Sequence, residues 1–209
     1  LADWHAGQRV DVRGQVVAPG FIDVHTHDDY ALLAKPNMDM KVSQGVTSVV
    51  VGNCSFSLVP LTFTEMKPGL ALLGDEQAFR FPKMSQFMDA VDDAPPALNA
   101  VFLVGHSTLR FGVLDRTDRP ATNEEIKIMR DRLQEGLKAG ASGLSTGLFY
   151  DPAKAAPTRE VIETSQVLKA YGARYVTHMG DEAEGVLDSL EETFEIGREC
   201  DSRAIVSHH

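Results

Sequence analysis

The stretch PGFIDVHTH, residues 19–27, ends a short apolar run with two histidines. The Pro-Gly turn before the run predicts a strand over about residues 21–27. Because strand side chains alternate between two faces, His25 and His27 are expected to point the same way. Two neighbouring imidazoles at the C-terminal end of a strand favour a metal site. The alternative is a strand that ends in two solvated polar residues, so the rest of the sequence has to decide.

Beyond this stretch, strand-like and helix-like segments alternate along the chain. Further strands are expected at residues 46–51, 100–104, 141–146, 173–177 and 203–207. Helices are expected at residues 36–44, 85–92, 122–140, 157–171 and 186–200. About six β-then-α steps result, and such alternation predicts a parallel sheet with helical crossovers. The long connection at residues 55–83 is rich in apolar side chains, including Phe63, and is expected to pack over another part of the protein, with a helical turn of its own.

Two architectures are possible for such a sheet: an open doubly wound sheet or a closed (β/α)8 barrel. No glycine-rich nucleotide-binding pattern follows the first strand, which weakens the open form. The barrel is favoured because polar residues follow different strands at their C-terminal ends, where barrel active sites are built. These residues are His25, His27, Cys54, His106, Tyr150, His178 and His208. We therefore predict an α/β fold, an incomplete (β/α)8 barrel at residues 19–209, with residues 1–18 as a lead-in strand or the tail of a small β-domain.

Composition narrows the class of partner. The 209 residues carry a formal net charge of −10, with a pI near 5.1, which argues against nucleic acid or an acidic membrane surface. No apolar run approaches the ~18 residues of a membrane span, and no basic-then-apolar leader is present. Two cysteines, Cys54 and Cys200, are too few for a disulfide framework, so a cytoplasmic location is expected.

Soft metal ligands gather at four predicted strand ends. The first strand ends in two histidines, the second is followed by Cys54, and the last two end at His178 and His208. Each residue alone has an ordinary alternative, since Cys54 could be an inert buried thiol and His178 a hydrogen-bonded core histidine. The joint pattern predicts a metal site, for which imidazole and thiolate are the typical zinc ligands.

The sequence resembles the amidohydrolase superfamily, and within it the N-acyl-D-amino-acid deacylase (D-aminoacylase) family. The matching stretches are APGFIDVHTHDD (18–29), QGVTSVVVGNCSFSLVP (44–60), GHSTLR (105–110), GASGLSTGLFY (140–150), YVTHMGDEAEG (175–185) and LEETFEIGRECDSRAIVSHH (190–209). In that family a cysteine after the second strand takes the place of a modified lysine on the fourth. Cys54 matches this cysteine, and residues 142–147 contain no lysine.

The resemblance implies roles for individual residues. Cys54, His178 and His208 resemble the ligands of a tightly bound zinc ion, and His25 and His27 a second, weaker site that shares the cysteine. His209 is the poorer ligand candidate, because its side chain should face away from that of His208.

Further residues resemble the surroundings of the metal. Tyr150 is similar to a substrate-pocket residue, with packing under a loop as the alternative. His106 and Arg110 are candidates for orienting a substrate carboxylate or the oxyanion, although Arg110 could equally be a surface residue. Asp28 and Asp29 could hold the imidazoles in place or be solvated.

The implied activity is zinc-dependent hydrolysis of N-acyl-D-amino acids, small-molecule substrates, by metal-activated water. The family's catalytic aspartate and a late arginine are expected beyond His209, and Ser55 and Gly180 depart from the common glycine and arginine of the family. Two alternatives are hydrolysis of another cyclic or linear amide, and a non-catalytic metal-binding chain. The edges of an incomplete barrel favour self-association or pairing with the remainder of the barrel.

Overall fold

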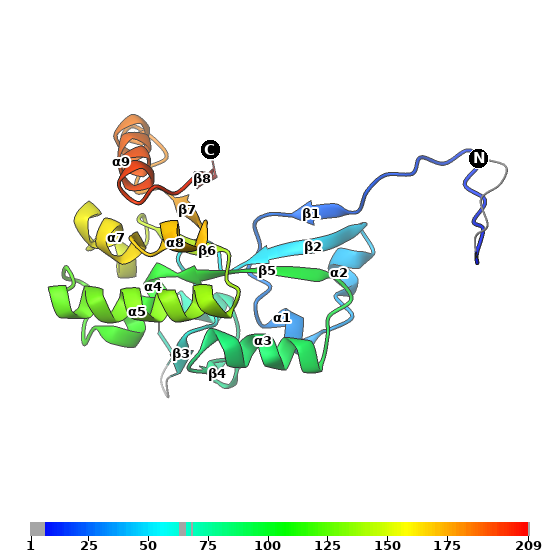
Figure 1. The fold of residues 1–209 in the computed structure, drawn as a ribbon, viewed down its shortest axis with the longest axis horizontal. Helices are drawn as coiled ribbons and strands as arrows, with labels where there is room; N and C mark the ends of the chain where they lie inside the picture. Colours follow the sequence, from blue (N-terminus) through cyan, green and yellow to red (C-terminus); the bar gives the residue numbers. More distant parts are fainter. Residues whose placement is uncertain (1–6, 63–65, 68, 209) are drawn as a thin grey trace.

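The computed structural model describes residues 7–62, 66–67 and 69–208. Its main feature is a curled sheet of six parallel strands, ordered β1-β2-β5-β6-β7-β8 (Figure 1). The strands are β1 (Phe21–Asp23), β2 (Val46–Val51), β5 (Asn99–Gly105), β6 (Gly143–Gly147), β7 (Arg174–His178) and β8 (Ala204–Ser207). Neighbours in the sheet follow one another along the chain, as in a (β/α)8 barrel, and the predicted partial barrel is confirmed.

Helices connect the strands and lie in an arc along the outer side of the sheet (Figure 1). The longer ones are α3 (Met84–Asp93), α4 (His106–Val113), α5 (Asn123–Ala139), α7 (Thr158–Ser165) and α9 (Val186–Glu199). Short ones are α1 (Ala31–Ala34), α2 (Asp39–Val42), α6 (Asp151–Lys154) and α8 (Leu168–Tyr171). A capping box starts α5, since the Thr122 hydroxyl accepts from Glu125 N–H and the Glu125 carboxylate accepts from Thr122 N–H.

Several predicted boundaries differ from the structure. The strand expected at residues 21–27 ends at Asp23, whose carboxylate accepts the His25 N–H and so removes it from the sheet ladder. The helix expected at residues 36–44 begins only at Asp39, because Met38 before it has a left-handed φ of 46°. Helices α1 and α4 were not predicted. The segment expected as one helix at 157–171 is divided into α7 and α8.

The long connection at residues 55–83 packs as predicted. It contains a two-stranded antiparallel pair, β3 (Leu61–Thr62) with β4 (Arg80–Phe81), and two turns of 3-10 helix, η1 (Leu70–Leu72) and η2 (Glu76–Ala78). Most of its described apolar side chains enter the hydrophobic core, with Phe56 and Phe79 buried, whereas Leu72 is largely exposed. Phe63 lies outside the described residues.

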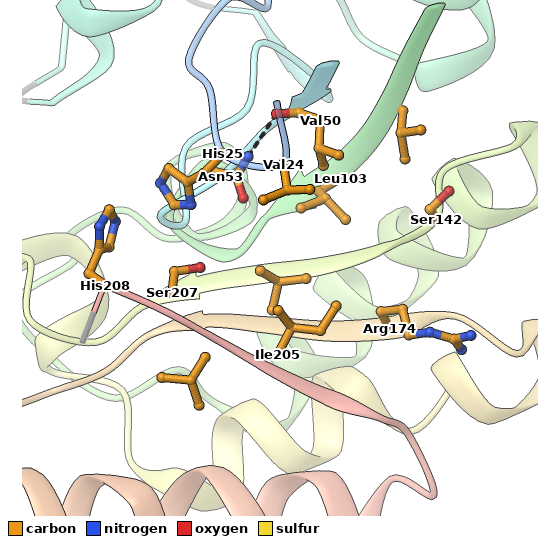
Figure 2. Close-up of a pocket in the computed structure, with 13 residues that line it drawn as sticks. Val24, His25, Val50, Asn53, Leu103, Ser142, Arg174, Ile205, Ser207 and His208 are labelled. Atoms are coloured by element: carbon orange, nitrogen blue, oxygen red, sulfur yellow. Dashed lines mark hydrogen bonds between the residues drawn. The ribbon is translucent and has the colours of Figure 1, made fainter. Parts of the chain in front are cut away.

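The concave face of the sheet is open and mostly apolar. A cavity of about 660 Å³ follows this face, with Val24, Leu103 and Ile205 among its lining (Figure 2). His25 and His208 lie at one end of the cavity and Arg174 at the other. In a complete barrel this face is a packed core. Here Val24 is 68% exposed and Ile205 48% exposed, as expected for part of a barrel.

The segment before the sheet is extended and exposed. Residues 7–18 contain a turn but no strand or helix, and they lead away from the sheet (Figure 1). The lead-in strand expected there is therefore absent from residues 7–18, and membership of a small β-domain stays a prediction. In the described part of the chain, no helix has the length and apolarity needed to cross a bilayer.

Candidate metal centre

The thiol of Cys54 lies among four imidazoles from three other strand ends. Its Sγ is 3.1 Å from His25 Nε2, 3.2 Å from His208 Nε2 and 3.8 Å from His178 Nδ1. His27 joins His25 and Cys54 in a second group, so the thiol is shared by two triads, each with donor atoms within 4.8 Å of one another. The structure brings together the five residues that the sequence predicts as ligands. His209 lies outside the described residues.

The cluster fits a metal ion. Tetrahedral zinc with ordinary bond lengths would separate a sulfur and a nitrogen ligand by about 3.6 Å, within the range of these distances. His27 Nδ1 is buried and has no hydrogen-bond partner among the described residues, which is unusual for a ring nitrogen. The His25 and His208 rings are also in edge contact, with centroids 4.3 Å apart.

Cys54 is held in a strained loop after β2. Cys54 and Ser55 have consecutive left-handed φ values of 51° and 75°, each costing about 1–2 kcal/mol for a residue with a Cβ. Buried hydroxyls hold this conformation: Ser55 Oγ lies 2.7 Å from Ser107 Oγ and accepts the Ser107 N–H, and Ser55 N–H donates to Ser145 Oγ. Ser55, which departs from the family's glycine, thus has partners that compensate for its backbone conformation.

Titration of the cluster is set by burial. Burial, followed by the neighbouring imidazoles of His208 and His27, lowers the pKa of His25 to about 4. The pKa values of His27 and His178 are also lowered, mainly by burial, so these three imidazoles are neutral and able to ligate a cation. Burial and the Glu182 carboxylate raise the pKa of the Cys54 thiol to about 11. A bound cation would reverse that shift by stabilising the thiolate.

The sequence profile of the amidohydrolase family matches residues 8–207, nearly the whole chain. The chain belongs to the amidohydrolase family. A D-aminoacylase of Alcaligenes xylosoxydans xylosoxydans is 51% identical over 100% of this chain and 43% of the relative. An N-acyl-D-aspartate deacylase of the same organism is 51% identical over 96% of this chain and 40% of the relative.

Comparison with solved structures also assigns this chain to the amidohydrolases. A D-aminoacylase crystal structure superposes with a TM-score of 0.97 at 49% identity, over 100% of this chain and 44% of that one. An N-acyl-D-glutamate deacylase from Bordetella bronchiseptica, complexed with zinc and a phosphonate inhibitor, superposes with a TM-score of 0.86 at 39% identity, over 91% of this chain and 40% of that one. The chain thus spans less than half the length of these relatives.

In this amidohydrolase the acidic residues after His27 contact groups other than imidazoles. Asp28 forms an ion pair with Lys41 at 3.1 Å, and Lys41 also contacts Asp23 at 2.8 Å. Asp29 is 2% exposed and accepts the backbone N–H groups of Gly52 and Leu58. Asp29 is shielded from solvent and Asp28 is partly exposed, and the structure gives neither carboxylate a hydrogen bond to a cluster imidazole.

A cavity of about 340 Å³ opens beside the metal centre. His27, Cys54 and Tyr150 line it on the cluster side, and Phe56 and Leu72 from the long connection line it on the other. Tyr150 OH lies 3.4 Å from His178 Nδ1, with the rings 4.7 Å apart. Burial raises the pKa of the Tyr150 phenol, which therefore stays protonated at neutral pH. The predicted pocket residue is thus next to the ligands.

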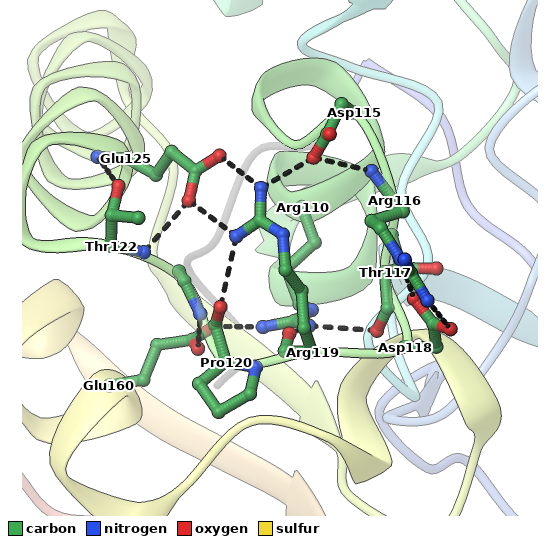
Figure 3. A network of polar contacts seen from close by, with 11 residues as sticks. Arg110, Asp115, Arg116, Thr117, Asp118, Arg119, Pro120, Thr122, Glu125 and Glu160 are labelled. Carbon is green, nitrogen blue, oxygen red and sulfur yellow. Dashed lines mark hydrogen bonds and ion pairs between the residues drawn. The ribbon is translucent and has the colours of Figure 1, made fainter.

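The structure does not bring the other two predicted substrate-binding side chains to this cavity. His106 and Arg110, both in α4, are fully buried against Glu160 of α7. Arg110 pairs with the Glu160 carboxylate and donates to the carbonyls of Thr117 and Arg119 (Figure 3). Arg110 is therefore neither a surface residue nor placed to meet substrate at this cavity. Its neighbours explain it as part of a buried polar network between helices.

Sequence reasoning missed three residues around the cluster. Lys41 holds two carboxylates on either side of the His25–His27 segment, and Asp23 accepts the His25 N–H. Glu182 follows His178 by four residues, and its Oε1 lies 3.8 Å from His178 Nε2. This four-residue separation was the signal in the sequence that could have pointed to Glu182, since a carboxylate near a ligating histidine often orients the ring.

Proposed function

We propose that this chain carries the zinc-binding part of an enzyme that hydrolyses N-acyl-D-amino acids to a carboxylate and a D-amino acid. One observation carries the proposal: the Cys54 thiol is within 3.8 Å of histidines from three strand ends. The relatives named for D-aminoacylase and N-acyl-D-aspartate deacylase activity support the substrate class. The zinc complex of the N-acyl-D-glutamate deacylase supports the choice of metal.

Five residues of this chain would hold the metal. Cys54, His178 and His208 are proposed to bind one zinc ion tightly, and His25 and His27 to form a weaker second site with the shared thiol. A relative described as having a binuclear metal centre supports two sites. When bound, zinc lowers the pKa of water and polarises an amide carbonyl.

The cavity beside the cluster is the proposed substrate site. Phe56 and Leu72 offer apolar contact to an acyl group or side chain, and the protonated Tyr150 hydroxyl is a hydrogen-bond donor next to His178. No residue of the cavity lining within the described chain is a cation, so the part of the enzyme described here provides no charged partner for the substrate carboxylate. The proton-transferring aspartate and a carboxylate-binding arginine are expected beyond residue 209.

Location and partners are proposals as well. A cytoplasmic location is supported by Cys54 and Cys200, which are both buried and unpaired. The exposed outer strands β1 and β8 and the apolar concave face are proposed to pair with the remainder of the barrel or with a second copy. The molecular mass of the 209-residue chain in solution separates these two partners.

The function is tested with the protein expressed from the complete coding sequence that contains these residues. Hydrolysis of N-acetyl-D-methionine, its L-isomer and a hydantoin is measured after zinc loading. We expect turnover of the D-isomer at least about tenfold above both competitors, and its loss in Cys54→Ser but not in Cys200→Ser. Preferred hydantoin opening would support the cyclic-amide alternative, and zinc binding without turnover of any amide would support a non-catalytic chain.

A further inference from the structure

The loop that carries Cys54 is fixed at both ends by one side chain. Asp29 accepts the Gly52 N–H with Oδ2 and the Leu58 N–H with Oδ1, both at 3.1 Å. These two amides bracket residues 52–58, which include Cys54. We propose that Asp29 is a positioning residue for Cys54, and that its carboxylate places the thiol within reach of both histidine groups.

The burial of Asp29 and its hydrogen bonds favour a role in positioning Cys54 over a role in overall stability alone. The residue is 2% exposed, and within the described part of the chain it forms no ion pair, unlike its neighbour Asp28, which pairs with Lys41. Burying a carboxylate without a cation is unfavourable unless backbone donors satisfy it. Both of its oxygens are used on the same loop. A neutral or shorter side chain could not accept both N–H groups at once.

The loop needs such restraint because its backbone is in an uncommon conformation. Gly52, Cys54 and Ser55 have φ values of 81°, 51° and 75°. Ser145 and Ser107 hold Ser55 and the Gly52 carbonyl from the side of β5 and β6. Asp29 provides the matching restraint from the side of β1. Loss of it would leave the longer Asn53–Thr26 hydrogen bond, at 3.4 Å, to hold the loop on that side.

The position of Asp29 in the chain links the two triads. Asp29 follows His27 by two residues. In addition, Asn53 Nδ2 of the Cys54 loop donates a hydrogen bond to the Thr26 carbonyl, at 3.4 Å. The segment after β1 and the loop after β2 are therefore joined on either side of the cluster. A shift of the loop away from this segment would lengthen the distance from Cys54 Sγ to His25 Nε2, now 3.1 Å.

The test compares Asp29→Asn with Asp28→Asn in the protein expressed from the complete coding sequence and reconstituted with cobalt(II). The readouts are the thiolate-to-cobalt charge-transfer band per bound ion and the zinc affinity in competition with a chelator. In Asp29→Asn, where an amide NH2 would face one of the N–H groups, we expect the band to fall at least twofold and zinc affinity to fall about tenfold or more. Asp28→Asn, which keeps both loop contacts, is expected to stay within threefold of wild type.

An Asp29→Asn chain with the full band and unchanged zinc affinity would overturn the proposal. If that variant shows no cooperative melting, Asp29→Glu is used, since its longer side chain keeps both acceptors but displaces the loop. A weaker band then supports the role and an unchanged one refutes it. The inference rests on the proposed metal centre, which fails separately if the wild-type chain binds neither zinc nor cobalt.

Discussion

Cys54 Sγ lies 3.2 Å from His208 Nε2, although the two residues are 154 positions apart in the chain. The thiol has the same relation to His25, so one sulfur serves both histidine groups. We predict that Cys54→Ser weakens zinc binding at both sites, by at least about 100-fold at the tighter one, because a neutral hydroxyl replaces a thiolate ligand. Zinc per chain after dialysis against a chelator measures the loss.

Cys200→Ser is the matched control. Cys200 is also buried and unpaired, but its Sγ contacts the Ile162 carbonyl, away from the cluster. Its zinc content is expected to equal that of the wild type. Equal zinc retention by the two serine variants would remove Cys54 from the ligand set.

Gly52, at the start of the loop that carries Cys54, is predicted to tolerate no side chain. An alanine Cβ there would lie 2.2 Å from the Leu103 carbonyl oxygen, at a φ of 81°. We expect Gly52→Ala to lower the free energy of unfolding by about 3 kcal/mol or more. Gly172→Ala has a similar left-handed φ of 58° but open space around it, so about 1 kcal/mol is expected. Urea unfolding of both variants checks the difference, and equal losses would contradict the predicted clash.

The buried carboxylate of Glu160 is predicted to matter for stability. It pairs with Arg110, lies 3.3 Å from His106 Nε2 and accepts the Ala121 N–H. Glu160→Gln would leave the Arg110 charge buried without its counter-ion, which costs about 3–5 kcal/mol. Glu163→Gln removes a half-exposed partner of Arg159, and less than about 0.5 kcal/mol is expected. Similar melting temperatures for the two variants would refute this reasoning.

Acid sensitivity is predicted at the start of α5. The Arg119 guanidinium and the Thr122 N–H lower the pKa of Glu125 from 4.5 to about 2. Below pH 4.5 the unfolded chain therefore binds a proton that the folded carboxylate does not, and stability falls as the pH falls toward 2. The stability difference between wild type and Glu125→Gln, about 0.5–1 kcal/mol at pH 7, is expected to shrink over this range. A difference that stays constant from pH 7 to 3 would exclude the linkage.

Residue type and strand position were sufficient to predict which residues the structure brings together at the candidate metal centre. His25, Cys54 and His178 each follow an apolar run, and parallel strands place their C-terminal ends together. The surroundings were not predictable in the same way. Lys41 reaches two carboxylates through a helix whose left-handed start the sequence does not reveal. Arg110 was assigned to substrate because the pattern gave no sign that α4 begins immediately after β5 and turns the side chain toward α7.

The curl of the sheet would give a bound metal a mechanical role. His25 follows β1 and His208 follows β8, the two outermost strands of the described sheet, yet their rings lie 4.3 Å apart. Two ions that share the Cys54 thiol would connect the residues after β1 with those at the ends of β7 and β8, and so link the two outer edges of the sheet. Because such an ion binds only the folded arrangement, a thousandfold excess over its dissociation constant adds about 4 kcal/mol to stability. Chelation would therefore loosen the curvature of the entire sheet as well as empty the site.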